Sequence, residues 1–502
     1  MLTWLLLSSF IFMLGMLLFK YCWTLYRQFN LTAGIPNWTY LPLVGTAYKF
    51  LGDTELFFSR LVEATIIADS KHGRFRVWMG PQFLILTNNT EDIKIITNTF
   101  IEKPLYYSFG RIWLGNGLVT APGEIWKKNI KNLSGTFTGS IVDGFQDVFN
   151  SQARKLLNQL KNEVGKPAFD ALHKYLAFAT LETICQTALG VTNISGRILT
   201  TDYYKAFNTA LELLICRGFN IFYYPESVYK LTPDYRKLKK NIEILHNVSN
   251  LVIAKKRKEW EEKKKNRISD VKDSTKGKFK TFLDILLALS ESEANLTDQQ
   301  IRAEVDTIIV GGQETNATTL SFVLLLLGSN PRVQEKLADE LKQIFGNSDR
   351  AVEKEDLAKM QYCEAVIYET LRLYPPIPAV MRYADKDLKM QDYTMPKGTV
   401  AIVSIWGTGR SEKLWGKNAK DFYPERWLQK DVPEAAAFTP FSYGRRACIG
   451  KKYAVTSLKT FVAWFIRDLE FKSDISNLGL KCDIALRAFR GNLLEVRLRN
   501  KE

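Results

Sequence analysis

The chain contains few of the residues that usually hold metal ions or cross-link small domains. Its 502 residues include three histidines, and its six cysteines are spread singly, with no Cys-x-x-Cys pair. This scarcity argues against a disulfide framework and a structural zinc site, and it indicates a reducing compartment. The histidines, His72, His173 and His246, lack the spacing of metal ligands. If a metal is bound, we expect a ligand other than histidine.

Nucleic-acid signatures are also missing from the chain. The formal net charge is +16, a basic balance that suits a nucleic acid, an anionic membrane surface or an acidic protein. The sequence holds no zinc-finger spacing, no RNA-recognition signature and no repeat of basic and aromatic residues. We therefore expect no nucleic acid among the partners, and favour the membrane and the acidic protein.

Charge is absent from the first 19 residues, Met1–Phe19, which are mostly Leu, Phe, Met and Ile. A run of about 18 apolar residues is long enough to cross a bilayer as a helix. A cleaved signal peptide is the alternative, but it needs basic residues before the run, whereas Lys20 and Arg27 follow it. The sequence predicts a membrane anchor with its basic flank over residues 1–27 and the remainder on the cytoplasmic side.

Two prolines, Pro36 and Pro42, predict a stiff linker over residues 28–46. The following body, residues 47–502, is dominated by helical periods from Glu91 onward. Hairpins are predicted at Phe75–Leu86, turning at Gly80-Pro81, and at Asp392–Ser404, turning at Pro396-Lys-Gly. The fold class is therefore mainly α with a smaller β region.

One cysteine stands out by its surroundings. Cys448 lies in the loop Phe441–Gly450, directly after Arg445-Arg446-Ala and before an apolar helical run. Two cations, the N–H groups of a tight turn and a helix N-terminus each lower the pKa of a thiol. Glycines in such a loop let a flat cofactor approach the backbone closely. The alternative is a free cysteine in a surface turn.

The long apolar helix predicted at Ile301–Gly328 is interrupted by polar residues. Gly311 and Gly312 precede Glu314 and Thr315. Paired glycines weaken a helix by about 1 kcal/mol each relative to alanine, so they indicate close packing or a local distortion. A crossing with another helix would explain the glycines, but a buried acid and hydroxyl need partners of their own.

The spacing Phe-x-x-Gly-x-Arg-x-Cys-x-Gly, at Phe441, Gly444, Arg446, Cys448 and Gly450, resembles the haem-binding loop of the cytochrome P-450 superfamily. The resemblance covers nearly the whole chain. It implies a cytochrome P-450 fold, a single globular haem domain behind the anchor, and haem b held by the Cys448 thiolate. The segments starting at Trp113 and Phe282 resemble family 4, the fatty-acid ω-hydroxylase clan, in its insect branch.

The same resemblance implies roles for further residues. Thr315 would bond dioxygen and Glu314 would help to supply protons, with Gly312 beside the haem. Three residues would contact the haem propionates: Trp126, Arg382 and Arg446. Since Ile130 stands where an arginine is usual, Lys127 or Lys131 is the expected replacement. A buried triad would support the cysteine loop: Glu369, Arg372 and Arg426.

Three departures from the family pattern carry expectations. Gly311 occupies the position at which family 4 often has a glutamate bonded to haem, so non-covalent haem is expected. Asn316 replaces a usual Thr or Ser, and Trp406–Arg410 lacks a common His-Arg pair. Neither the Asn316 replacement nor the missing His-Arg pair removes an essential part of the family's site.

The expected function is that of a microsomal monooxygenase: a monomer in the endoplasmic reticulum membrane that oxidises a lipophilic compound with O2. Electrons would come from NADPH through cytochrome P-450 reductase, with cytochrome b5 as a second donor. The substrate could be a fatty acid, hydrocarbon, odorant or xenobiotic. The residues expected to meet the reductase are basic: Lys127, Lys128, Lys131, Arg445, Lys451 and Lys452. Candidate substrate-facing residues are apolar or aromatic: Tyr106, Tyr107, Phe109, Phe219, Phe222, Ile308 and Ile377–Val380.

Two other functions remain open from the sequence. A peroxide isomerase or dehydratase on the same fold would need no reductase, and Thr315 argues against it. A non-catalytic haem or lipid-binding protein belongs to another class, and the presence of both Glu314 and Thr315 argues against that.

Overall fold

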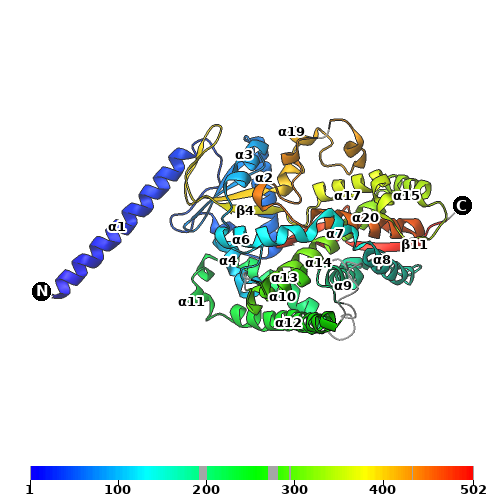
Figure 1. The fold of residues 1–502 in the computed structure, drawn as a ribbon. Coiled ribbons are helices and arrows are strands. Elements are labelled where there is room, and N and C mark those ends of the chain that lie inside the picture. The colour runs from blue at the N-terminus through cyan, green and yellow to red at the C-terminus, as the bar shows by residue number, and fades with distance from the viewer. Residues whose placement is uncertain (1, 192–200, 270–280, 293–295, 432, 501–502) are drawn as a thin grey trace.

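The computed structural model describes residues 2–191, 201–269, 281–292, 296–431 and 433–500. A mainly helical body carries a smaller β region, and one helix, α1 (Leu2–Leu31), projects away from it (Figure 1). The predicted fold class, mainly α with a smaller β region, is confirmed.

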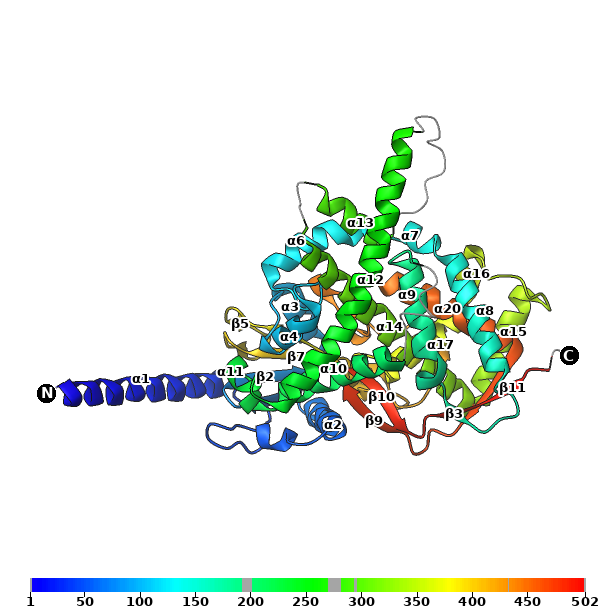
Figure 2. The ribbon, with the colours of Figure 1, turned by 90° about the horizontal axis from the view of Figure 1, so that it is seen from below.

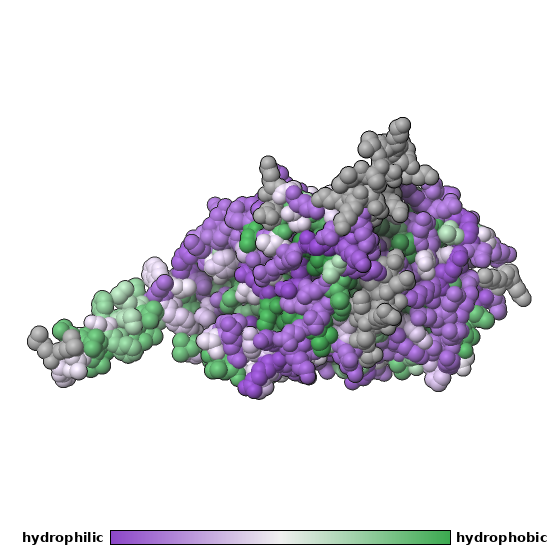
Figure 3. Space-filling view, turned by 60° about the horizontal axis from the view of Figure 1, so that its bottom comes forward, coloured by the Kyte–Doolittle hydropathy of each residue, from purple (hydrophilic) through white to green (hydrophobic). Residues whose placement is uncertain are grey.

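Helix α1 is long and apolar enough to cross a membrane over Thr3–Leu31, and within the described residues no other helix meets that test. Figure 3 shows it as a hydrophobic rod beside a largely hydrophilic face of the body. The helix continues past Arg27, so residues 28–31 of the expected linker are helical. Its end packs on the body, where Trp78 Nε1 donates to Gln28 Oε1 at 3.2 Å and Phe29 stacks on Trp78 at 4.8 Å. These contacts attach the base of the helix to the body.

The larger sheet has the strand order β1-β2-β7-β4, with β1 at Arg74–Met79, β2 at Gln82–Thr87, β7 at Val400–Ser404 and β4 at Ala379–Tyr383. The first predicted hairpin is confirmed, since β1 and β2 pair antiparallel.

The second predicted hairpin is wrong. The short strand β6 (Thr394–Met395) pairs with β5 (Leu388–Lys389), while β7 pairs parallel with β2 and antiparallel with β4. All five residues of β7 are buried, as expected for a strand with neighbouring strands on both sides. The two-residue strand β6 is too short to cover β7 in a hairpin.

The remaining strands lie near the C-terminus. Strands β9 (Gly479–Asp483) and β10 (Ala485–Arg490) form a hairpin whose turn residue, Ile484, has a φ of +72°. A second sheet has the order β3-β11-β8, formed by Phe169–Asp170, Leu493–Leu498 and Leu469–Ser473. Figure 2 shows the β9–β10 hairpin beside α2 and α10. Strand β10 of this hairpin also contacts the long central helix α14 (Asp298–Ser329).

The longer helices of the body are α2 (Thr54–Ser70), α3 (Thr90–Thr99), α6 (Gly123–Leu133), α8 (Gln146–Lys161), α9 (Ala177–Thr187), α10 (Thr201–Phe219), α12 (Pro233–Ser269), α13 (Phe282–Ser290), α14 (Asp298–Ser329), α15 (Pro331–Phe345), α17 (Gln361–Leu373) and α20 (Lys451–Asp468). The short ones are α4 (Leu105–Phe109), α5 (Arg111–Leu114), α7 (Gly139–Asp143), α11 (Glu226–Tyr229), α16 (Lys354–Lys359), α18 (Ile405–Thr408) and α19 (Glu412–Trp415). A π-helical segment, Leu172–Leu176, precedes α9.

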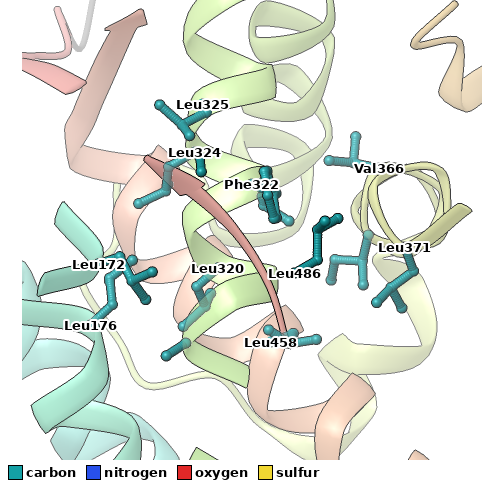
Figure 4. Packing of buried hydrophobic residues seen from close by; sticks show 14 of the residues in the cluster. Leu172, Leu176, Leu320, Phe322, Leu324, Leu325, Val366, Leu371, Leu458 and Leu486 are labelled. Atoms are coloured by element: carbon teal, nitrogen blue, oxygen red, sulfur yellow. The ribbon is translucent and has the colours of Figure 1, made fainter. Parts of the chain in front are cut away.

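The core is built around α14. The helix starts with a capping box between Thr297 and Gln300 and stays α-helical through Gly311 and Gly312, so the glycines produce no break. Its C-terminal half is apolar and buried. Leu320 and its neighbours meet side chains from the π-helical segment, α17, α20 and β10 (Figure 4). Because so many elements pack on α14, its polar residues hold fixed positions in the body.

Candidate active site

The cysteine loop is closed by its own backbone. Cys448 N–H donates to Phe441 O at 2.8 Å, and Gly450 N–H donates to Cys448 Sγ at 3.3 Å. Gly444 has a φ of +71°, and an added Cβ there would lie 2.6 Å from Thr97 O, so no larger residue fits. The Cys448 side chain remains exposed directly before α20. The loop thus presents one sulfur atom at a fixed position.

The expected source of a lowered thiol pKa is wrong for this loop. Desolvation by the surrounding loop raises the pKa of Cys448 although the sulfur is accessible, and the Gly450 N–H opposes this rise. Arg446 instead donates to Ala121 O at 2.8 Å and lies over the Trp126 ring at 4.5 Å. A metal cation bound to the sulfur would itself deprotonate the thiol.

Arg382 and Arg446 come together beside this loop with too few acceptors. The Nε atom of each is buried without a hydrogen-bond partner in the described part of the chain. Burial lowers the pKa of Arg382, and burial together with Arg382 lowers that of Arg446 to about 10. Two neighbouring cations with lowered pKa values and unpartnered Nε atoms indicate that an anion binds there.

Lys103 is a third cation at this site, and sequence reasoning missed it. Burial, Arg382 and Arg446 together lower its pKa well below the usual value. The expected replacements for the missing arginine, Lys127 and Lys131, are both exposed, and Lys127 pairs with Glu124. The signal in the sequence was weak: one lysine just before the segment of candidate substrate-facing residues.

These groups fit a haem. The neighbouring carboxylate is Glu102, whose two oxygens each lie 3.0 Å from Gly123 N. Three cations and one carboxylate leave two positive charges, and a haem carries two propionates. Trp126 adds an indole N–H, which is a donor only and suits a carboxylate. Trp126, Arg382 and Arg446 are therefore brought together as the sequence predicted.

On α14 the two glycines have different surroundings. An added Cβ at Gly312 would lie 2.5 Å from Ile184 Cδ1, so this glycine lets α14 pack closely on α9. An added Cβ at Gly311 would meet nothing within 4 Å. Contact between Gly312 and a haem stays a prediction, while the open side of the helix is at Gly311. Thr315 is half-buried and donates to Gly311 O at 2.6 Å.

Glu314 does not reach solvent, contrary to what a proton-supplying acid suggests. Its side chain is 4% exposed and is held by Arg487 of β10, with Nε and one terminal nitrogen 2.8 and 2.7 Å from Oε1. Arg487 is a second residue that sequence reasoning missed, because nothing local links two residues 173 positions apart.

The predicted triad is assembled and buried. Glu369 accepts from both Arg372 Nε and its terminal nitrogen at 2.8 Å and from Arg426 Nε at 2.9 Å. Trp427 adds a bond from its Nε1 to Glu369 at 3.0 Å. Arg372 also donates to the carbonyls of Gly409, Ala419 and Asp421. The triad thereby fixes the irregular segment that leads to the cysteine loop.

The candidate substrate-facing residues divide into two groups. Tyr106 and Phe109 pack with Tyr224 across the gap between α4 and the end of α10, and Ile308 is buried. Phe222 is 69% exposed, and Phe219 stacks on Phe57 of α2 at 3.9 Å. The six basic residues expected to meet a reductase are all exposed.

Comparison with known proteins identifies the family. The family model for cytochrome P-450 matches residues 36–481. Human cytochrome P-450 4V2 is 33% identical over 471 residues, which cover 92% of this chain and 89% of that protein. Cytochromes P-450 4d1 and 4g15 of Drosophila melanogaster are 31% and 28% identical, over 94% and 96% of this chain and 95% and 96% of their own lengths.

These relatives confirm the resemblance to family 4 and its insect members. Members of the family bind haem b through a cysteine thiolate, and electrons from NADPH generally arrive through a reductase. The match to the family model covers most of the chain, including its cysteine loop, so this chain belongs to the cytochrome P-450 family and is a haem monooxygenase.

Proposed function

We propose that Cys448 is the thiolate ligand of the haem iron and that the enzyme oxidises a lipophilic substrate at the open side of α14. The cysteine loop is the observation that carries this proposal. Its sulfur is fixed by two backbone bonds and lies on a loop bordered by cations that match two propionates. Trp126, Arg382, Arg446 and Lys103 would hold those propionates.

When bound, haem supplies the activation of dioxygen and the oxidation of a C–H bond. One oxygen atom enters the substrate as hydroxyl, and the other leaves as water with two protons; NADPH supplies both electrons through the reductase. The chain's own residues orient the substrate, exclude water and supply the protons. Thr315 Oγ1 is the hydroxyl on the open side of α14, so it moves a proton toward the reacting oxygen. Glu314 is the acid that reloads it.

The haem is held without a covalent bond from the helix. Gly311 offers no side chain, and the space beside it would accept one. The propionate contacts and the Cys448 sulfur therefore carry the whole attachment.

We propose that the enzyme acts at the cytoplasmic face of the endoplasmic reticulum as a monomer anchored by α1. The apolar span and the basic residues after it support this orientation. The exposed lysines of α6 and of the start of α20 suit the acidic reductase, with cytochrome b5 as a second donor. Charges of this kind mainly set the association rate and its salt dependence.

A carbon monoxide difference spectrum tests the ligand. The reduced protein should show the red-shifted Soret band of thiolate ligation, and Cys448→Ala should lose it. A band that survives Cys448→Ala would refute the assignment. Cys363→Ala serves as the control, because this cysteine is fully buried and belongs to the core.

Turnover and binding assays address the reaction and the substrate. Product that forms only with NADPH and reductase supports the monooxygenase; product from a peroxide without them would indicate the isomerase or dehydratase. A spectral titration against fatty acids, hydrocarbons, odorants and xenobiotics then ranks the substrates, since it reports binding at the iron without a partner protein.

A further inference from the structure

Glu314 needs a route to water if it is to supply protons, and the structure closes the direct one. The side chain is buried, and Oε1 takes both contacts from Arg487. The other oxygen, Oε2, has no hydrogen-bond partner among the described residues. A buried carboxylate oxygen without a partner is costly, about 1–3 kcal/mol or more. It is also the free atom at which a proton can arrive.

Tyr204 of α10 is a candidate for delivering it. The side chain is buried in the core cluster that includes α14 and β10. Burial and, after it, the charge of Glu314 raise the pKa of Tyr204 to about 12, while Arg487 opposes the rise. The Tyr204 hydroxyl, like Glu314 Oε2, is buried without a hydrogen-bond partner among the described residues. A phenol that stays neutral can pass a proton along by donating one and accepting another.

The outer side of Tyr204 faces a surface pair. The His173 ring contacts the Tyr204 ring with centroids 5.9 Å apart and planes at 72°. His173 Nδ1 lies 2.5 Å from Asp170 Oδ2, and the two side chains are 45% and 28% exposed. The charge of Asp170 also acts on Tyr204. Tyr204 therefore stands between an exposed histidine–aspartate pair and a buried glutamate–arginine pair.

The backbone around His173 is π-helical, a feature that suits a functional role. His173 belongs to the π-helical segment Leu172–Leu176, which joins α9 directly. Single π-turns within helices occur frequently at functional sites. Asp170 caps this segment by accepting from His173 N–H at 3.2 Å, and Asn492 of the chain's C-terminal part donates to Asp170 at 2.7 Å. The surface pair is held by contacts from two distant parts of the chain.

We propose that protons reach Glu314 from solvent through the His173–Asp170 pair and the hydroxyl of Tyr204. The inference rests on the proposed function, in which Glu314 reloads Thr315. His173 takes a proton from water, the Tyr204 hydroxyl gives its proton to Glu314 Oε2, and it regains one from the His173 side. Ordered water bridges the steps that exceed a hydrogen bond. The tyrosine ends each cycle neutral, and the proton leaves in the water formed from dioxygen.

Tyr204→Phe tests the route by removing one hydroxyl. Tyr175→Phe is the matched control, because it removes a tyrosine hydroxyl from the π-helical segment of His173, and this hydroxyl donates instead to Glu163 at 2.6 Å. Each variant is reconstituted with reductase, NADPH and dodecanoic acid as the probe. The rate of NADPH consumption is then measured in H2O and in D2O. We expect Tyr204→Phe to be at least about tenfold slower, with a larger solvent isotope effect, because a lost proton donor removes general acid catalysis. Tyr175→Phe should match the wild type.

His173→Gln and Glu314→Gln separate the possible outcomes. His173→Gln changes an exposed residue, so the variant should fold as the wild type does. It should also slow NADPH consumption. If Glu314→Gln is slow while Tyr204→Phe and His173→Gln equal the wild type in rate and isotope effect, protons enter elsewhere and the inference is wrong, although the proposed function stands. If the wild type consumes no NADPH with reductase, or lacks the red-shifted Soret band, the proposed function itself fails. Haem content confirms that each variant is loaded.

Discussion

Removing the carboxylate of Glu369 should prevent the protein from holding haem. Glu369 is fully buried and accepts five hydrogen bonds: two from Arg372, one from Arg426, and one each from Tyr423 N–H and Trp427 Nε1. Glu369→Ala leaves both guanidinium groups buried without a counter-charge. Breaking a buried ion pair in this way costs about 3–5 kcal/mol.

That loss is large against the stability of a typical protein, about 5–15 kcal/mol. It also falls on one region, because the triad fixes the backbone from Gly409 to Trp427 ahead of the cysteine loop. Glu369→Gln keeps the shape but offers a single oxygen acceptor, so at least some of the five bonds are lost with the charge. We expect Glu369→Ala to carry no haem and Glu369→Gln to carry much less than the wild type.

The assay is haem per polypeptide after purification, together with the carbon monoxide spectrum and a urea unfolding curve. Glu335→Gln is the control, because its side chain is 66% exposed and pairs with Arg499 at the surface, where an ion pair contributes about 0–1 kcal/mol. Glu369→Ala protein with full haem content and an unchanged Soret band would refute the reasoning, since the loop would then hold its sulfur in place without the triad.

Four further predictions concern separate parts of the enzyme. Lys103→Gln should release haem to an acceptor protein about ten- to a hundredfold faster, as expected for one charge-assisted hydrogen bond, while Lys103→Arg and Lys127→Gln should not; equal rates in all would remove Lys103 from the propionate site. Acid–acetone extraction should free all the haem because Gly311 has no side chain to bond it, and haem left on the polypeptide would contradict this. Burial raises the pKa of Glu304 to about 7, so the folded state binds one more proton than the unfolded state between pH 4.5 and 7. The free energy of unfolding of the wild type, measured in urea and compared with that of Glu304→Gln, should therefore fall as the pH rises through this window. The rate of reduction by the reductase should fall with ionic strength, and a salt-independent rate would argue against the basic face.

Much of the site could be predicted because its signals are local. Cys448 stands within ten residues of its supporting glycines, and Glu369 lies one helical turn from Arg372. Such spacings fix which side chains share a turn or a face before any tertiary contact forms. The helix containing Gly311 and Gly312 was likewise predicted from its apolar periodicity. Whether the glycines indicate close packing or a distortion was decided only by the close approach of Gly312 to Ile184 of α9.

The misses have a common cause, since each depends on elements that meet only in the folded body. The second hairpin was wrong because β7 lies between β2 and β4, a placement set by burial on both sides rather than by the turn before it. The cations near Cys448 were expected to act on the thiol, yet Arg446 turns away toward Trp126.

The sequence by itself determined that a cysteine loop, a long helix with an acid and a hydroxyl, and an apolar N-terminal span occur in one basic chain. Only the tertiary structure decided which charges meet. It brought Lys103 to Arg382 and Arg446, and Arg487 to Glu314, because ion pairs between distant residues follow from how helices and strands pack and not from their spacing along the chain.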